Sequence, residues 1–419
     1  MLFSPPESAV LHGPTSVEPS CDAVAPAARA VPAPSSPRVQ LVYFNAGGGH
    51  RASALALAAG IRRAGLDWQV EPVNLFERVD ARDVFRRWTG MPPEAIYNKR
   101  LALGWTAGLA HELRLLQAGI RVTHPFLMKR LRQHWRESRP DLVVSLVPNF
   151  NRAMRLSLAA ECPRVPYATV MTDLADLPPR FWIEPDLPID LVCGTPHAVA
   201  QARAAGCSPA RVHAVSGMLL REDFYAPRLD RAQRAAERRA LGLPAHGPVG
   251  LVLFGGEGSR QMLAIARQLP DLPLILMCGR NARLAQRLRE LPAAGAPRAV
   301  VAFASDVPRY MQLADLFIGK PGPGSLSEAV HMGLPCIVAA NAATLPQERY
   351  NTRWLAEQGL GVTVTGFDAV GHAVADVLAR LPALQANTRR IDNRALFEVP
   401  RVLAGLLAGA TEPVARVMA

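Results

Sequence analysis

Short apolar runs alternate with amphipathic segments along most of the chain. In the first half, six runs have the length and composition of buried strands: residues 40–45, 68–75, 141–147, 167–173, 190–195 and 211–217. The segments between these runs carry apolar residues at helical spacing. Such an alternation predicts a parallel sheet that is covered by helices on both faces.

The same pattern restarts in the second half. Further strands are expected at residues 249–254, 272–279, 298–304, 314–320, 335–340 and 361–365, and residues 219–248 between the halves read as a linker and a helix. We therefore expect two doubly wound domains, residues 39–221 and 222–400, followed by a C-terminal helix or tail at 401–419. Two such domains in tandem form a cleft at the carboxyl ends of both sheets, where ligands bind.

The N-terminal residues 1–38 are rich in Pro, Ala and Ser and have no apolar period. We expect them to form a disordered leader, without the basic and apolar regions of a secretory signal. The six cysteines are scattered without a CxxC pair, which argues against a structural zinc site and is typical of a reducing compartment. These features predict a cytoplasmic protein.

The formal net charge of +12 favours anionic partners. Nucleic acid, anionic lipid and phosphorylated metabolites all fit that charge. The chain has no basic and aromatic motif of a nucleic-acid-binding fold, so a nucleic-acid partner is not expected.

The stretch "ADLFIGKPGPGSLSEAVH", residues 314–331, reads as a strand, a glycine turn and a helix. Its glycines allow close approach of a ligand, and a helix start offers free N–H groups to a diphosphate. Because proline has no N–H, the expected donors are Gly324, Ser325 and Leu326. Glu328, one turn into the helix, is suited to bind two ribose hydroxyls; alternatively, it is an ordinary stabilising acid of the first turn.

The stretch "FNAGGGHRAS", residues 44–53, is a second strand, glycine turn and helix. It is not GxGxxG, and no acidic residue ends the next strand suitably, so a nicotinamide dinucleotide is not expected. Gly48 and Gly49 would let an acceptor hydroxyl approach His50, whose imidazole is suited to take its proton at neutral pH. A purely structural role for His50 is the alternative. "FGGEGS", residues 254–259, is a third glycine turn and carries little information alone.

Together these motifs, with "VMTDL", "FASDVPRYMQ" and "LPQERYN", resemble one family over roughly residues 39–400. The chain is similar to the monogalactosyl- and processive glucosyl-diacylglycerol synthases of glycosyltransferase family 28. The lipid II-forming glucosaminyltransferase of peptidoglycan synthesis is a more distant relative. The resemblance implies a GT-B fold of two Rossmann-like domains, a UDP-sugar donor, a lipid acceptor, and inversion at the anomeric carbon without metal or other cofactor. No DxD motif follows a strand, which agrees with that expectation.

The resemblance also implies roles for individual residues. His50 is the expected base, and Asp173 is its orienter or the alternative base. Glu328 would bind the ribose, and the turn with Gly322, Gly324 and Ser325 would bind the diphosphate. The remaining donor-side residues would be Phe303 and Ala304 at the nucleobase, Gln347 and Glu348 at the sugar, and Gly255 and Gly256 along the cleft.

The sequence departs from the family in two places. Plant members have His and Trp after "TDL", whereas this chain has Pro178 near the position of that His and Trp182 near that of the Trp. The sugar-side loop "NAATLPQERYN" lacks the usual glycine before Gln347. The identities of sugar and acceptor therefore stay open. We expect Trp182 on the acceptor or membrane side.

Residues 99–136 have eight Lys or Arg side chains, one acid, and the aromatics Trp105, Phe126 and Trp135. This composition favours a helical pair on an anionic bilayer, with Arg130 and Arg132 at lipid headgroups. The alternative is two ordinary surface helices with solvated arginines. We expect a peripheral enzyme at the inner face of the cytoplasmic membrane.

The sequence thus predicts a glycosyltransferase that moves a hexose from a UDP-sugar to a diacylglycerol-like or other amphipathic acceptor. Three alternatives stay open. The first is a transferase of N-acetylglucosamine to another membrane glycolipid. The second is a hydrolysing nucleotide-sugar epimerase, which shares the fold. The third is a non-catalytic subunit that binds a nucleotide sugar.

Overall fold

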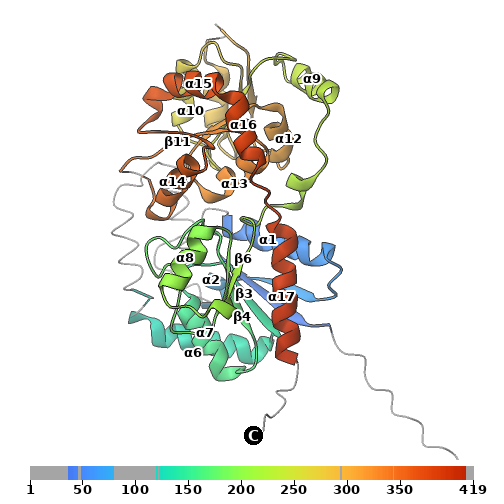
Figure 1. The fold of residues 1–419 in the computed structure, drawn as a ribbon, viewed down its shortest axis with the longest axis vertical. Helices are drawn as coiled ribbons and strands as arrows, with labels where there is room; N and C mark the ends of the chain where they lie inside the picture. Colours follow the sequence, from blue (N-terminus) through green and yellow to red (C-terminus); the bar gives the residue numbers. More distant parts are fainter. Residues whose placement is uncertain are drawn as a thin grey trace, which may run out of the picture. The chain divides into compact units, whose positions relative to one another are not determined.

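The computed structural model describes residues 36–45, 49–79, 119–120, 122–292, 295–342 and 344–411. Residues 1–35 lie outside these ranges, and the described residues from 36 to 411 belong to one compact unit. Within this unit lie two parallel six-stranded sheets, each flanked by helices (Figure 1). The GT-B architecture of two doubly wound domains, expected from the sequence, is present.

The first sheet has the strand order β2-β1-β3-β4-β5-β6. Its strands are β1 (Arg38–Tyr43), β2 (Gln69–Asn74), β3 (Leu142–Ser145), β4 (Tyr167–Val170), β5 (Asp190–Cys193) and β6 (Val212–Ala214). The helices of this half are α1 (Gly49–Arg63), α2 (Leu75–Val79), α6 (His124–Ser138), α7 (Asn151–Glu161), α8 (Pro196–Ala204) and the short η1 (Pro209–Arg211).

The second sheet has the order β12-β11-β10-β7-β8-β9, the arrangement of a dinucleotide-binding fold. Its strands are β7 (Gly250–Leu253), β8 (Leu274–Met277), β9 (Arg298–Val301), β10 (Leu316–Gly319), β11 (Cys336–Ala339) and β12 (Gly361–Val364). Its helices are α10 (Gln261–Gln268), α11 (Ala282–Arg289), α12 (Val307–Leu313), α13 (Pro323–His331), α14 (Arg349–Glu357), α15 (Val370–Ala379) and α16 (Leu381–Arg389), with short turns η3 (Pro346–Glu348) and η4 (Phe367–Ala369). The turn η2 (Glu222–Tyr225) and helix α9 (Arg231–Ala240) lie between the halves.

Each apolar run that the sequence singled out contains one of these strands. The strands β3, β4, β7, β8 and β10 are buried at every residue. A parallel strand covered on both faces needs apolar side chains throughout, which is why continuous apolar runs located these elements correctly.

The last helix, α17 (Ala395–Thr411), returns to the first sheet. Val399 and Leu403 share a core with Val39 and Leu41 of β1, and α17 runs beside α1 in Figure 1. A Cβ atom at Gly60 of α1 would lie 2.6 Å from the carbonyl oxygen of Leu396, so glycine allows the close approach of these two helices. The boundary expected at residue 400 therefore falls inside a helix that belongs to the first domain's core.

Both sheets place a topological switch point at their carboxyl ends. The chain leaves β1 for β2 on one side and returns to β3 on the other, and the corresponding pair in the second sheet is β7 and β10. Loops diverge at such points and leave a crevice between them, which is where open α/β sheets bind ligands. Among the described helices, none is both long and apolar enough to cross a membrane.

Candidate functional site

A cavity of about 940 Å³ lies where the loops after both sheets meet. It is lined by residues that follow β1 and β4 of the first sheet and β7, β9 and β10 of the second. The site residues expected from the sequence that line it are Gly49, His50, Asp173, Gly255, Gly256, Phe303, Ala304, Gly322, Gly324, Ser325, Glu328, Gln347 and Glu348. Gly48 and Trp105 lie outside the described residues.

The glycine turn after β10 leads directly into helix α13, which begins at Pro323. The amide of Leu326 already donates to Gly322 within the helix, at 3.0 Å. Leu326 is therefore not a free donor, contrary to expectation, and Gly324 and Ser325 are the expected donors that remain. A Cβ atom at Gly324 would meet no heavy atom within 4 Å. Bare backbone amides thus border open space at the positive end of a helix dipole, which suits an anion.

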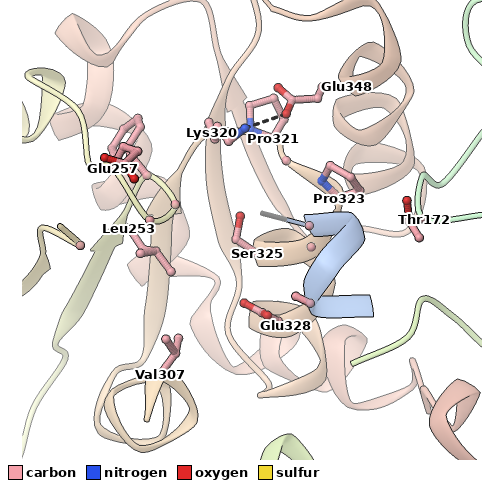
Figure 2. A pocket seen from close by; sticks show the side chains of 18 of the residues that line it. Thr172, Leu253, Glu257, Val307, Lys320, Pro321, Pro323, Ser325, Glu328 and Glu348 are labelled. Atoms are coloured by element: carbon pink, nitrogen blue, oxygen red, sulfur yellow. Dashed lines mark hydrogen bonds and ion pairs between the residues drawn. The ribbon is translucent and has the colours of Figure 1, made fainter. Parts of the chain in front are cut away.

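Glu328 lies on the same side of α13 as Ser325 (Figure 2). Burial raises the pKa of its carboxyl group to about 7, while Arg221 acts in the opposite direction. Within the described part of the chain, no hydrogen-bond partner holds this carboxylate. A desolvated carboxylate without a partner gains more from ligand hydroxyls than a solvated one would.

Lys320 directly follows β10, and its ammonium group lies 2.9 Å from the Glu348 carboxylate, as the dashed line in Figure 2 marks. Both side chains line the cavity. The side-chain amide of Asn351 donates to the Pro321 carbonyl at 2.7 Å and so fixes the loop that follows Lys320. Lys320 was not among the site residues expected from the sequence. Its position directly after an apolar strand and before a glycine turn is the signal that locates it.

Phe303 is 59% exposed, although it is a large apolar side chain. The guanidinium of Arg280 lies 5.0 Å from the centre of its ring. The Arg280 amide donates to the Gly256 carbonyl at 2.8 Å, and a Cβ atom at Gly279 would lie 2.1 Å from that same oxygen. The "FGGEGS" turn is therefore fixed against Gly279, and Arg280 adds a second cation to the cavity.

His50 lies at the switch point of the first sheet. Its Nδ1 atom is 2.9 Å from the carbonyl oxygen of Leu146 and 2.9 Å from the hydroxyl of Thr172. Because a carbonyl only accepts, we assign the ring proton to Nδ1, which leaves the lone pair on Nε2. Burial lowers the pKa of His50 to about 4. The imidazole is therefore neutral at neutral pH, and Leu146 and Thr172 hold its orientation.

Asp173 is held by Trp182, whose indole N–H donates to Oδ2 at 2.9 Å. Trp182 is itself fixed by Asp176, which accepts its backbone N–H at 2.6 Å. Burial raises the pKa of Asp173 to about 7, and the Trp182 hydrogen bond opposes that shift. Trp182 is only 1% exposed, so it reaches neither a membrane nor bulk solvent. Contact of Trp182 with a membrane is therefore excluded, whereas its expected place on the acceptor side, next to Asp173, stays a prediction.

Part of the residues that line this cavity belong to a segment that matches a known protein family. Residues 252–397 match the family model of the glycosyltransferase family 28 C-terminal domain. These residues are therefore similar to a family 28 glycosyltransferase domain. The resemblance stated from the sequence is confirmed. The family 28 domain carries every cavity residue from Gly255 to Glu348, including the cations Arg280 and Lys320.

Beyond this segment, most of the chain is similar to a chloroplastic monogalactosyldiacylglycerol synthase of Spinacia oleracea. The two are 28% identical over 348 residues, which are 78% of this chain and 64% of the spinach protein. The chain thus spans less than two thirds of that relative's length.

Solved structures share the fold. MurG of Acinetobacter baumannii aligns with a TM-score of 0.55 at 13% identity, over 88% of this chain and 99% of the other. A UDP-GlcNAc 2-epimerase of Neisseria meningitidis, bound to UDP-GlcNAc, aligns with a TM-score of 0.52 at 10% identity, over 89% and 100%. At these identities the likeness shows the GT-B fold alone.

Of the segment expected at a membrane, residues 119–120 and 122–136 are described. Trp135 is 1% exposed, and its indole N–H donates to the Ser157 hydroxyl at 2.8 Å. Trp135 therefore belongs to the core and not to a headgroup layer. Arg132 pairs with Glu161, whereas Arg130 lies over the half-exposed ring of Phe126. Neither arginine lines the cavity.

Proposed function

We propose that the protein transfers a hexose from a UDP-sugar to a lipid acceptor, with inversion and without a metal ion. One observation carries the proposal: a single cavity is lined by the neutral imidazole of His50 and by the open start of α13 with Glu328 beside it. A proton acceptor and a site for an anionic leaving group in one cavity are what displacement at an anomeric carbon needs.

The donor occupies the family 28 domain. Uracil stacks on Phe303 and hydrogen-bonds the backbone at Ala304, and the ribose hydroxyls donate to Glu328. The diphosphate accepts from the amides of Gly324 and Ser325. Gln347 and Glu348 bind the sugar.

In the chemical step, Nε2 of His50 takes the proton of the acceptor hydroxyl. The acceptor oxygen forms a bond to the anomeric carbon as the bond to the UDP oxygen breaks, and UDP leaves with that electron pair. The α13 amides, Lys320 and Arg280 stabilise the negative charge that develops on the diphosphate, which is why we expect no metal requirement. The bound diphosphate also raises the basicity of His50, because a nearby anion favours the imidazolium. Asp173 is the alternative base.

The lipid acceptor rests on the similarity to the spinach synthase, whose name specifies a diacylglycerol product. Phe126 and Arg130 on α6 offer an apolar and a basic side chain to an anionic bilayer. We accordingly propose a peripheral enzyme at the cytoplasmic face of a membrane.

The test is transfer from tritiated UDP-galactose, UDP-glucose and UDP-GlcNAc into mixed micelles with and without diacylglycerol, with and without EDTA. The proposal expects label in the organic phase that depends on diacylglycerol and resists EDTA, and an anomeric coupling constant that reports inversion. Label in another glycolipid supports the N-acetylglucosamine alternative. An epimerised sugar in the aqueous phase, or nucleotide binding without UDP release, contradicts the transferase. Glu328→Ala is the control, since weakened UDP affinity in that variant ties the activity to this cavity.

A further inference from the structure

A second cavity, of about 480 Å³, lies at the opposite edge of the first sheet. Tyr167, the first residue of β4, lines this cavity, whereas Thr172, just after the end of β4, lines the large one. At about 3.3 Å per residue, the strand separates the two by roughly 16 Å. The second cavity therefore lies apart from the proposed donor and acceptor sites, and the proposed function does not use it.

Three arginines line this cavity: Arg155 of α7, Arg164 in the following loop, and Arg211 at the end of η1. Asp190 is the one acid among its lining residues. Both oxygens of that carboxylate are already engaged, one by Arg211 at 2.8 Å and the other by His213 at 3.0 Å. The lining therefore carries more positive than negative charge. The nearby end of α17 adds only about half a negative charge.

Arg155 is the least compensated of the three. Its Nε donates to the Pro188 carbonyl at 3.2 Å, but its Nη1 is buried and has no hydrogen-bond partner within the described residues. Burial lowers the pKa of Arg155, and the positive charge of Arg211 lowers it further. The guanidinium groups of Arg155 and Arg211 thus repel each other beside one cavity. An anion bound between them would attract both and outweigh that repulsion.

Helix α17 also lines the cavity, with Gly405 and Gly409 one turn apart. A Cβ atom at either glycine would meet nothing within 4 Å. Glycine costs helix stability relative to alanine, and here its effect is to leave room in the cavity. The volume lies within the range of small-molecule sites and exceeds that of a bare phosphate ion.

From this geometry we infer that the second cavity binds the phosphoryl group of a phosphate ester, with Arg155 and Arg211 as its charged partners. Guanidinium groups match phosphate oxygens in bidentate geometry, which makes this anion class the best fit. The ester is a soluble metabolite or the headgroup of a phospholipid.

The test is isothermal titration calorimetry of the full chain with glycerol 3-phosphate, and cosedimentation with vesicles of phosphatidic acid in phosphatidylcholine. Two variants change the site from opposite sides: Arg155→Gln removes the charge, and Gly405→Leu fills the space without removing any contact. Arg203→Gln, an exposed arginine on α8 outside the cavity, is the matched control. Lys320→Gln tests whether the phosphate ester binds in the large cavity, which Lys320 lines, and not in the second one.

We expect both site variants to weaken binding by about tenfold or more, Arg155→Gln because a charge-assisted pair is lost and Gly405→Leu because the leucine occupies the space of the ligand, while Arg203→Gln and Lys320→Gln keep it. Binding of glycerol 3-phosphate with this pattern identifies a soluble ester, and the same pattern seen only with vesicles identifies a headgroup. Absence of binding in both arms, loss of binding in Lys320→Gln, or binding unchanged in Gly405→Leu and Arg155→Gln would overturn the inference. Transfer from the UDP-sugar is measured separately, so its failure is distinguishable from failure of this site.

Discussion

The indole N–H of Trp182 donates a 2.9 Å hydrogen bond to Asp173, and the ring of Trp182 lies 6.2 Å from that of His50. One buried side chain thus contacts one of the two base candidates and lies close to the other. Burial raises the pKa of Asp173 to about 7, and the hydrogen bond from Trp182 favours its charged form. The protonation state of Asp173 at neutral pH therefore depends on Trp182, which does not itself line the cavity.

Replacing Trp182 by Phe should raise the pKa of Asp173 above its value of about 7. The variant removes a hydrogen bond to the charged form, and we expect an upward shift of up to about one pH unit. Carbon-13 NMR of Asp-labelled protein measures this pKa, with Asp173→Asn to assign the signal. Trp354→Phe, on α14 outside the cavity, serves as the control. An unchanged Asp173 pKa in Trp182→Phe would show that this hydrogen bond does not influence the ionisation of Asp173.

The pH dependence of kcat/KM separates His50 from Asp173 as the base. Either group acts deprotonated, so the rate falls as the pH drops through its pKa. With His50 as base the fall occurs near pH 4, and with Asp173 it occurs near pH 7. We expect kcat/KM to fall near pH 4, with His50 as the base. We also expect a loss of about 10²–10⁴-fold in kcat for His50→Ala with UDP affinity nearly unchanged. Full turnover in His50→Ala together with loss in Asp173→Asn would make Asp173 the base.

Two glycines near the donor site should respond oppositely to alanine. Gly324→Ala adds a methyl group to open space, so folding is unimpaired while UDP binding weakens. Gly279→Ala places a Cβ atom 2.1 Å from the Gly256 carbonyl oxygen at a φ of +60°, so it destabilises the fold. Thermal unfolding and calorimetric UDP titration of both variants test this contrast. Wild-type UDP affinity in Gly324→Ala would move the diphosphate elsewhere.

Glu328 should reduce the stability of the unliganded protein at alkaline pH. Its pKa is raised from 4.5 to about 7 in the folded state. The stability from its protonated form is present below pH 4.5 and is lost as the pH rises through 7. We therefore expect Glu328→Gln to be more stable than wild type at pH 8 by up to about 3 kcal/mol, and similar at pH 5. The measurement is denaturant unfolding at both pH values, with the exposed Glu290→Gln as control. Equal differences at both pH values would contradict a raised pKa for Glu328.

The membrane contact should depend on Phe126 and Arg130 more than on Arg132. Phe126 is 51% exposed beneath the Arg130 guanidinium, while Arg132 is engaged by Glu161. Phe126→Ser with Arg130→Glu should reduce cosedimentation with anionic vesicles, more at low than at high salt, and leave UDP binding intact. Vesicle binding that ignores both the double variant and salt would assign α6 to an ordinary solvated surface.

The chain's own hydrophobic pattern determined the two sheets, because strands buried on both faces are apolar at nearly every position and therefore stand out locally. The proposed donor motif was equally local. A glycine turn that opens a helix brings backbone amides together from consecutive residues, so the sequence alone could propose Gly324, Ser325 and Glu328 as donor-binding residues, and all three line the cavity.

Tertiary structure alone decided which groups hold the base candidates. The Leu146 carbonyl, the Thr172 hydroxyl and the Trp182 indole reach His50 and Asp173 only because parallel strands end at one edge of the sheet. It also decided that Trp182 and Trp135 are buried and that α17 returns to the first domain. Side-chain burial and the packing of a distant helix depend on contacts between residues far apart in the chain, and the period of a local pattern carries no record of which partner covers an apolar face.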